Sequence, residues 1–332
     1  MQPLRYVPYH QMGGAPNVVV DGSPTDGTAL CLSHWPNLPV PPGLEEDLSA
    51  EMAMAYLARF DLHGPAEIVS NNHFDQDGLV SAFALTDPDA ALARRELLID
   101  VAAAGDFATY RLRDAAHISM ALAAFGDGTR SPLGPAGDDY DTWAAALYTD
   151  LLGRLLEMAD HPDRYRDLWQ DEEETLAASE RMVAAGHVTI EEIPEVDLAV
   201  VHVPQGAPDA GGHRFGGQWV TGLHPMAINN ATECCAVLSV RGQSYTFGYR
   251  YETWVQYRSR RPRARVDLGP LAEELTSLEP GDARWSFDGV GSIIPRLQLS
   301  GSEDSAISPD DFRSRLEAHL RTAPPAWDPY AR

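Results

Sequence analysis

The amino-acid sequence predicts an α/β fold in which an N-terminal domain built on a parallel sheet precedes a smaller α/β C-terminal domain. Two observations carry this prediction. Short buried strand segments alternate with helical segments in the first part of the chain, an order that is typical of parallel sheets. After Gly186, strand-like segments predominate instead. We therefore expect a boundary near residue 185, with domains over 64–185 and 186–325 and an N-terminal extension over 1–63 packed on the first domain.

Hydrophobic periodicity and turn residues assign the individual elements. Short strands and turns are expected over 14–40, and further strands over 67–70, 97–100, 188–191, 198–204, 235–240 and 245–257. Helices are expected over 45–60, over 140–158, 164–185 and 310–321, and from residue 78 onwards. Since carboxyl ends of parallel strands meet at one edge of a sheet, the residues that follow the strands are the first candidates for a site.

Composition limits the classes of function. The chain of 332 residues has a net charge of −24 and contains no lysine. This charge disfavours long duplex nucleic acid as a partner and leaves a small anionic substrate open. The lack of lysine excludes P-loop, Schiff-base and general-base lysines. No apolar run is long enough to cross a bilayer, and the N-terminus lacks a secretory signal, so we expect a cytoplasmic protein without a membrane partner. The oligomeric state stays open, with a homodimer as one possibility.

The segment 70–82 carries the clearest chemical signal. His73, Asp75 and Asp77 alternate directly after the expected strand 67–70, and Asp100 ends the next expected strand. Carboxylates and a neutral imidazole suit Mn²⁺ or Mg²⁺, and carboxylates this close together need a cation. A calcium loop of the EF-hand type is disfavoured because its twelfth position is alanine. A polar turn that caps a helix, with Asp77 at the N-cap, is the structural alternative.

Residues 73–82 resemble the first motif of the DHH phosphoesterase superfamily, an Asp/His-x-Asp-x-Asp-Gly-x-x-Ser/Ala pattern between a strand and a helix. The resemblance implies that His73, Asp75 and Asp77 are metal ligands. It also implies metal-binding roles for Asp100, as the family's second motif, and for Asp150, which resembles the fourth motif. The superfamily includes exonucleases, cyclic-dinucleotide phosphodiesterases and pyrophosphatases.

The C-terminal part resembles the family's substrate-binding domain, which carries an Arg-Ser element, a helix and a glycine-rich loop. Arg258, Ser259 and Arg260 correspond to the first element, and Gly289 and Gly291 correspond to the loop. Guanidinium groups bind phosphate bidentately, so the arginines are the expected phosphate anchors. A solvated strand edge that balances acidic neighbours is the alternative.

The chain departs from the family in lacking the Asp-His-His triplet and the loop histidine. Asp114 and His117 share a helical face and are the nearest candidates for catalytic groups. The resemblance implies a Mn²⁺- or Mg²⁺-dependent phosphoesterase that hydrolyses a nucleotide, a short oligonucleotide or a cyclic dinucleotide. The alternative is a catalytically inactive module that binds a nucleotide or a protein. His34 and Trp35 follow an apolar strand, and we consider both a core pair and a role in the site.

Overall fold

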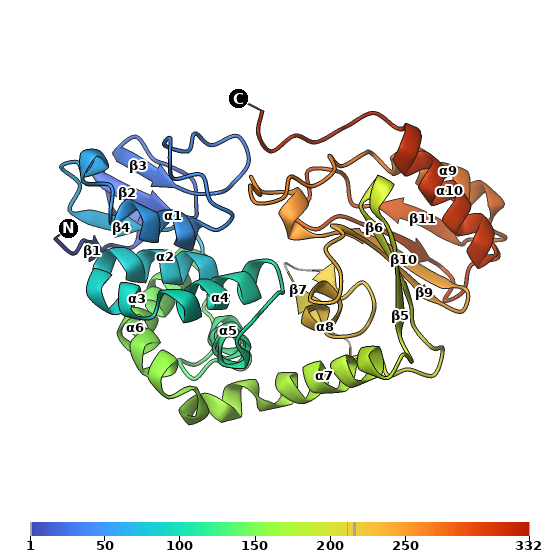
Figure 1. The fold of residues 1–332 in the computed structure, drawn as a ribbon, viewed down its shortest axis with the longest axis horizontal. Coiled ribbons are helices and arrows are strands. Elements are labelled where there is room, and N and C mark those ends of the chain that lie inside the picture. Colours follow the sequence, from blue (N-terminus) through green and yellow to red (C-terminus); the bar gives the residue numbers. More distant parts are fainter. Residues whose placement is uncertain (1, 211, 215–216, 332) are drawn as a thin grey trace. The chain divides into compact units, whose positions relative to one another are not determined.

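The computed structural model describes residues 2–210, 212–214 and 217–331, which divide into two compact units (Figure 1). The first unit comprises residues 2–173 together with Tyr257–Ser259, and the second comprises Glu174–Gln256 and Arg260–Ala331. The division at residue 173 falls inside helix α7 (Arg166–Ala184), whereas we expected a boundary near residue 185. The chain is α/β, with a parallel sheet in the first unit and a mixed sheet in the second. Among the described helices, none has the length and apolar character needed to cross a membrane.

The sheet of the first unit is parallel throughout, in the strand order β1-β4-β2-β3. Its strands are β1 (Arg5–Tyr6), β2 (Asn17–Val20), β3 (Thr28–Leu32) and β4 (Ile68–Ser70). The expected N-terminal extension therefore supplies three of the four strands of this sheet. Because β4, β2 and β3 are neighbours and run the same way, their carboxyl ends lie side by side at one edge.

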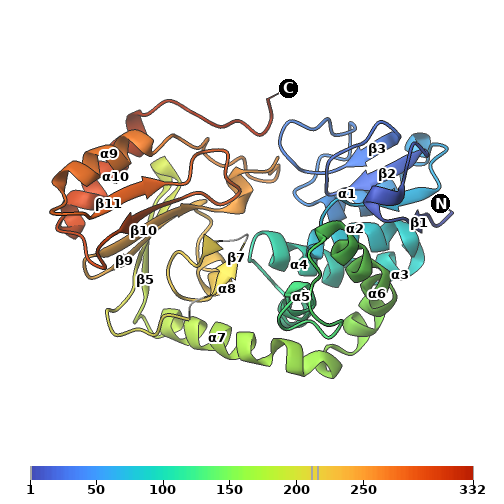
Figure 2. The same cartoon turned by 180° about the vertical axis from the view of Figure 1, so that it is seen from behind.

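Helices of the first unit pack on this sheet and on one another. They are α1 (Ser49–Tyr56), α2 (Gln76–Thr86), α3 (Pro88–Ala93), α4 (Arg95–Asp106), α5 (Arg113–Gly126) and α6 (Tyr140–Asp160). Helix α2 contacts the sheet on one side and α4, α5 and α6 on the other. The view from behind in Figure 2 shows the same order of sheet, α2 and outer helices.

The strand expected over 97–100 is wrong, because these residues lie inside helix α4. Leu98, Val101 and Ala102 are buried at helical spacing, and the alanines that follow favour a helix. A short apolar run does not distinguish a buried strand from a buried helix by periodicity alone.

The second unit contains a six-stranded sheet in the order β11-β12-β10-β9-β6-β5, in which only β6 and β9 pair in parallel. Its strands are β5 (Thr189–Ile193), β6 (Leu198–His202), β9 (Ala236–Arg241), β10 (Ser244–Tyr249), β11 (Arg284–Phe287) and β12 (Arg296–Ser300). A small hairpin pairs β7 (His213–Arg214) with β8 (Gly217–Gln218). The strand expected over 245–257 ends at Tyr249, and a 3₁₀ turn at Tyr251–Thr253 follows.

Alternating side chains of this sheet build two cores. Leu238 and Phe247 pack with α9 (Gly269–Leu278) and α10 (Pro309–Thr322) on one face. Val237 points the other way and packs with Ile228 of α8 (Pro225–Asn229) and with the end of α7. The alternation follows from the twofold side-chain period of a strand.

Candidate metal centre

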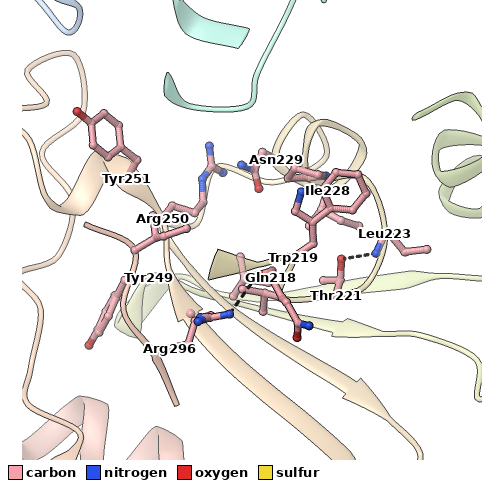
Figure 3. Close-up of a pocket in the computed structure, with 15 residues that line it drawn as sticks. Gln218, Trp219, Thr221, Leu223, Ile228, Asn229, Tyr249, Arg250, Tyr251 and Arg296 are labelled. Atoms are coloured by element: carbon pink, nitrogen blue, oxygen red, sulfur yellow. Dashed lines mark hydrogen bonds between the residues drawn. The ribbon is translucent and has the colours of Figure 1, made fainter. Parts of the chain in front are cut away.

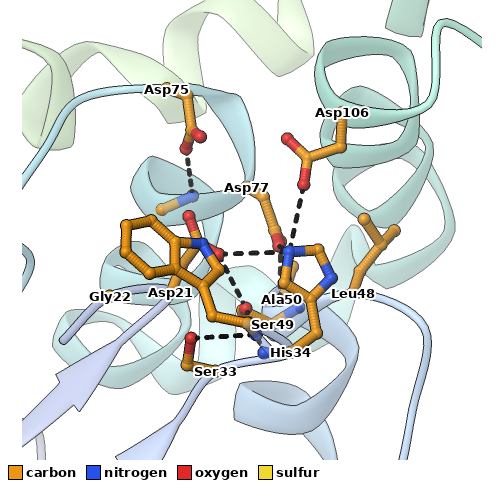
Figure 4. Close-up of polar contacts among 12 residues, drawn as sticks. Asp21, Gly22, Ser33, His34, Leu48, Ser49, Ala50, Asp75, Asp77 and Asp106 are labelled. Atoms are coloured by element: carbon orange, nitrogen blue, oxygen red, sulfur yellow. Dashed lines mark hydrogen bonds and ion pairs between the residues drawn. The ribbon is translucent and has the colours of Figure 1, made fainter. Parts of the chain in front are cut away.

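Six acidic and histidine side chains converge at the carboxyl edge of the first sheet, and Figure 4 shows several of them. Each lies in or directly after an element described above. Asp21 follows β2, His34 follows β3, His73 and Asp75 lie between β4 and α2, Asp77 lies in the first turn of α2, and Asp106 ends α4. Neighbouring parallel strands thus bring together residues from three separate parts of the chain.

A fully buried group of four side chains forms the inner part of the cluster. One ligand atom each from Asp21, His34, Asp77 and Asp106 lies within 4.8 Å of all the others. The Nε2 atom of His34 is 3.4 Å from Asp21 Oδ1, 3.8 Å from Asp77 Oδ2 and 3.4 Å from Asp106 Oδ2. A single imidazole nitrogen therefore faces three carboxylates away from water.

A second group, consisting of Asp21, His73 and Asp75, forms the outer part. The Nε2 atom of His73 is 2.8 Å from Asp75 Oδ2 and 3.4 Å from Asp21 Oδ2. The side chains of His73 and Asp75 are 23% and 16% exposed, so this group is accessible where the inner one is not. Asp21 belongs to both groups: its Oδ1 faces His34 and its Oδ2 faces His73.

Hydrogen bonds from outside the cluster fix the orientation of these side chains. His34 Nδ1 donates to the carbonyl oxygen of Asp47 at 2.6 Å, so Nε2 is the ring nitrogen that faces the carboxylates. Asp77 accepts the backbone N–H groups of Ser49 and Ala50, at 2.8 and 2.7 Å, at the start of α1. Ser49 Oγ also donates to Asp21 at 2.8 Å. A histidine whose second nitrogen donates to a carbonyl is a common arrangement among metal ligands.

Burial dominates the electrostatics of the inner group. It raises the pKa of the Asp21 carboxyl well above its usual range, and the neighbouring carboxylates of Asp75, Asp77 and Asp106 add to this effect. Burial, together with Asp75, raises the pKa of Asp77 to about 7. It also lowers the pKa of His34 to about 4, so this imidazole is neutral at physiological pH. A neutral imidazole nitrogen is the form in which histidine ligates metal.

The outer pair behaves differently. Burial lowers the pKa of His73, but the adjacent Asp75 carboxylate outweighs burial and leaves this pKa raised. Burial likewise raises the pKa of Asp75, but His73 and the N–H group of Gly78, which donates at 2.8 Å, leave it lowered. These two groups therefore form an ion pair at the accessible side of the cluster.

The donor set fits divalent metal. The cluster contains four carboxylates and two imidazoles, and two divalent cations would balance the four negative charges. Oxygen and nitrogen donors of this kind suit Mn²⁺, and carboxylates also suit Mg²⁺. Asp21, with one oxygen directed into each group, would be a ligand available to metal in either group.

Glycines next to the carboxylates allow the elements to approach closely. A Cβ atom on Gly78 would lie 2.2 Å from Asn71 Nδ2 and 2.5 Å from the Tyr148 hydroxyl. A Cβ atom on Gly22 would lie 2.1 Å from Asn72 Oδ1. All three distances are far below van der Waals contact, so glycine allows these segments to pack as they do.

Comparison with known proteins assigns the chain to a family. The sequence pattern of a family described as "Family of unknown function (DUF6687)" matches residues 2–331. The chain belongs to the DUF6687 family. No curated protein and no solved structure matched it. None of these comparisons links the DUF6687 chain to the DHH superfamily, so that resemblance stays a prediction.

Of the five predicted metal ligands of this DUF6687 chain, the structure brings together His73, Asp75 and Asp77 but not Asp100 or Asp150. Asp100 lies in the middle of α4 and accepts the backbone N–H groups of Arg111 and Leu112, at 2.9 and 2.6 Å from its Oδ2, where α5 begins. Asp150 lies on α6 and pairs with Arg154 one turn later. Both carboxylates are thus engaged in local structural contacts.

The predicted catalytic pair also lies outside the cluster. Asp114 is exposed in the first turn of α5. His117 stacks on Trp169, with ring centroids 3.9 Å apart, and its Nε2 lies 3.1 Å from Glu173 Oε2. This arrangement connects α5 to α7 and is typical of a structural histidine.

The predicted Arg-Ser element is divided between the two units. Arg258 and Ser259 belong to the first unit, where their backbone N–H groups donate to Asp47 Oδ1 at 2.5 and 2.8 Å. Asp47 is also the residue whose carbonyl oxygen binds His34. Arg260 belongs to the second unit and forms an ion pair with Asp197. Arg258 is exposed and belongs to the same unit as the cluster. It is one residue from the end of the segment Tyr257–Ser259, after which the chain returns to the second unit.

The predicted glycine loop lies in the second unit, between β11 and β12, and Gly289 adopts a positive φ of 89° there. A fully buried arginine, Arg265, donates to the carbonyl oxygens of Val290 and Ser292 at 2.7 and 2.6 Å. Burial lowers the pKa of this guanidinium to about 9. Arg265 therefore fixes the loop that contains Gly289 and Gly291.

Sequence reasoning missed Asp21 and Asp106 and left His34 between two interpretations. Asp21 and His34 directly follow expected strands. Because ligand sites lie at the carboxyl ends of parallel strands, the same argument applied to these strands also selects both residues. The wrong prediction of a strand over 97–100 made Asp100 the candidate ligand in place of Asp106, which lies six residues later in the same helix.

Proposed function

We propose that this protein is a metal-dependent phosphoesterase that acts on a small phosphorylated molecule. The observation that carries the proposal is the shared carboxylate of Asp21, with one oxygen in each of two adjoining Asp/His groups. Two-metal sites of this kind are common in enzymes that cleave phosphate esters. The resemblance of residues 73–82 to the DHH motif supports the same reaction class.

Asp21, His34, Asp77 and Asp106 would hold one Mn²⁺ or Mg²⁺ ion, and Asp21, His73 and Asp75 a second. Bound metal would supply a water of lowered pKa and neutralise charge that develops on the phosphoryl oxygens. The chain's own groups prepare this site: Asp47 orients His34, and the start of α1 orients Asp77. These contacts limit the reorganisation that metal binding needs.

The substrate would approach from the side of His73 and Asp75, since their side chains are the exposed ones in the cluster. Arg258 is the candidate phosphate anchor, because it is exposed and its backbone is bound to Asp47 in the same unit. The net charge of −24 favours a small anion over a long polyanion. A nucleotide, a short oligonucleotide or a cyclic dinucleotide fits this description.

A second candidate is a nucleotide- or protein-binding module without turnover. The environment of His117 favours it, because this candidate catalytic group is stacked on Trp169 and bound to Glu173. Such a module need not retain metal; it would bind its ligand but would not hydrolyse a phosphodiester.

The test is Mn²⁺-dependent hydrolysis of bis-p-nitrophenyl phosphate, together with the metal content of the purified protein. Asp75→Ala removes a ligand of the outer group, and Asp150→Ala removes a predicted ligand that lies outside the cluster. We expect metal-dependent hydrolysis that is lost in Asp75→Ala and retained in Asp150→Ala. A protein that shows no hydrolysis of this or any nucleotide substrate and binds no Mn²⁺ would refute the phosphoesterase and leave the binding module.

A further inference from the structure

A cavity in the second unit lies against the sheet at β9 and β10 and is bordered by α8 (Figure 3). It has a volume of about 70 Å³ and opens to solvent. All the residues that line it belong to the second unit, and the metal cluster lies in the first. The residues of the cavity and those of the metal cluster thus belong to different units.

The interior of the cavity is apolar and contains one large aromatic surface. Val237 and Ile228 are buried beneath it, and Trp219 forms a wall. The indole is held in place, because Gly212 lies so close that a Cβ atom there would be 2.2 Å from the ring. His224 packs against Trp219 with ring centroids 4.9 Å apart. A fixed indole presents a flat surface for stacking without loss of side-chain entropy.

The charged groups at the rim are already balanced. Arg250 forms an ion pair with Glu252, and Arg296 lies 3.4 Å from Asp288 through its Nε. A ligand that enters the cavity therefore gains little from a full charge of its own. The side-chain amides of Gln218 and Asn229 also line the cavity, and amides offer both a donor and an acceptor to the edge of a polar ring.

A glycine lies in the wall of the cavity. Gly248 lies within β10, between two paired strands, where glycine weakens a sheet. A Cβ atom at Gly248 would lie 2.7 Å from Val220 Cγ2, so the glycine allows the Val220 side chain to pack directly on the backbone of β10. A glycine in such a position often marks close approach of a ligand or of another segment.

We propose that this cavity binds the base of a nucleoside or nucleotide. A nucleobase is planar, uncharged and edged with donors and acceptors, and so matches a neutral cavity with an indole wall and amides at its border. An aliphatic chain would gain nothing from the amides, and a free phosphate would meet arginines that are already paired. The proposal goes beyond the phosphoesterase reaction, because it assigns a base site to the second unit.

Calorimetric titration of the full chain with adenosine and uridine, in buffer that contains EDTA, tests this site without metal or turnover. We expect Trp219→Ala to weaken binding about tenfold to a hundredfold, since stacking of a base on an aromatic ring contributes that much. Val220→Trp should abolish binding by filling the cavity. Trp327→Ala removes an indole of the same unit that does not line the cavity, and it should leave the affinity unchanged.

Thermal melts of each variant verify that the fold is retained. Failure of both nucleosides to bind the wild-type chain would overturn the proposal, as would equal affinities in the wild type, Trp219→Ala and Val220→Trp. Because no metal takes part, either result leaves the test with bis-p-nitrophenyl phosphate unaffected.

Discussion

Replacement of Asp21 by asparagine is expected to stabilise the metal-free protein and to remove most of the stabilisation that Mn²⁺ provides. The substitution keeps the size of the side chain. One oxygen remains to accept the bond from Ser49 Oγ, and an amide replaces the oxygen that faces His73. Asp21→Asn therefore deletes one buried charge with little change in packing.

The magnitude follows from the distances in the inner group. Ligand atoms of Asp21, Asp77 and Asp106 lie within 4.8 Å of one another. Two negative charges at this separation repel by roughly 3–4 kcal/mol at an effective dielectric constant of about 20. Partial protonation relieves some of this repulsion, so we expect a net gain of about 1–3 kcal/mol in the free energy of unfolding.

The sign of the pH dependence follows from the raised pKa of Asp21. A carboxyl whose pKa is higher in the folded than in the unfolded state stabilises the fold at acid pH, and this contribution is lost as the pH rises through the folded pKa. The advantage of Asp21→Asn without metal should therefore be largest at about pH 8 and shrink toward about pH 5.

Differential scanning calorimetry in EDTA and in Mn²⁺ measures both effects. A ligand at a hundredfold excess over its Kd stabilises a protein by about 2.7 kcal/mol, which raises Tm by several degrees. Wild type and the control Asp150→Asn should show this increase, and Asp21→Asn should not. A mutant that is less stable in EDTA at about pH 8 and still gains the full increase in Mn²⁺ would refute a shared metal-ligating role for Asp21.

Three further predictions concern the same unit. Mn²⁺ affinity should rise between about pH 6 and pH 8, because protons compete for Asp77, whose pKa is about 7 without metal. Equal Mn²⁺ affinities at the two pH values in titration calorimetry would contradict this. Gly78→Ala should lower the free energy of unfolding by about 1–3 kcal/mol, because its Cβ would clash with Tyr148. Gly153→Ala, in open space on α6, should raise it by up to about 1 kcal/mol. Equal effects of the two substitutions in urea titrations would count against the packing argument. Asp100→Ala should lower the free energy of unfolding by about 1–2 kcal/mol, because its hydrogen bonds to the start of α5 are lost, and it should leave Mn²⁺ binding intact. Loss of Mn²⁺ binding in this variant would show that Asp100 is a ligand.

The part of the cluster that could be predicted from the sequence is the part that is local. His73, Asp75 and Asp77 lie within five residues between a strand and a helix, so their convergence needs only that turn. Asp21 and His34 join them only because β4 pairs beside β2 and β2 beside β3. Individual strands were visible in the hydrophobic pattern, but their order depends on contacts distant in sequence.

Glycines carry a signal that could have extended the prediction. Asp21 precedes Gly22, Asp77 precedes Gly78, and Asp106 follows Gly105. A Cβ atom on Gly105 would lie 2.6 Å from the Cβ of Gln76, so this glycine too lets α4 approach the start of α2. Buried carboxylates that converge on one point require their backbones to come close together, and glycine permits that approach.

The segment Tyr257–Ser259 has a consequence for how the protein is made. It belongs to the first unit although 83 residues of the second unit, Glu174–Gln256, precede it in the chain. Asp47, whose carbonyl oxygen orients His34, obtains the N–H groups of Arg258 and Ser259 only after these residues have left the ribosome. Domains generally fold as units during synthesis, N-terminal first. Here the support of the metal centre is completed only when residues 258 and 259 have been translated, so a nascent or truncated chain ending at residue 173 would hold an unfinished site.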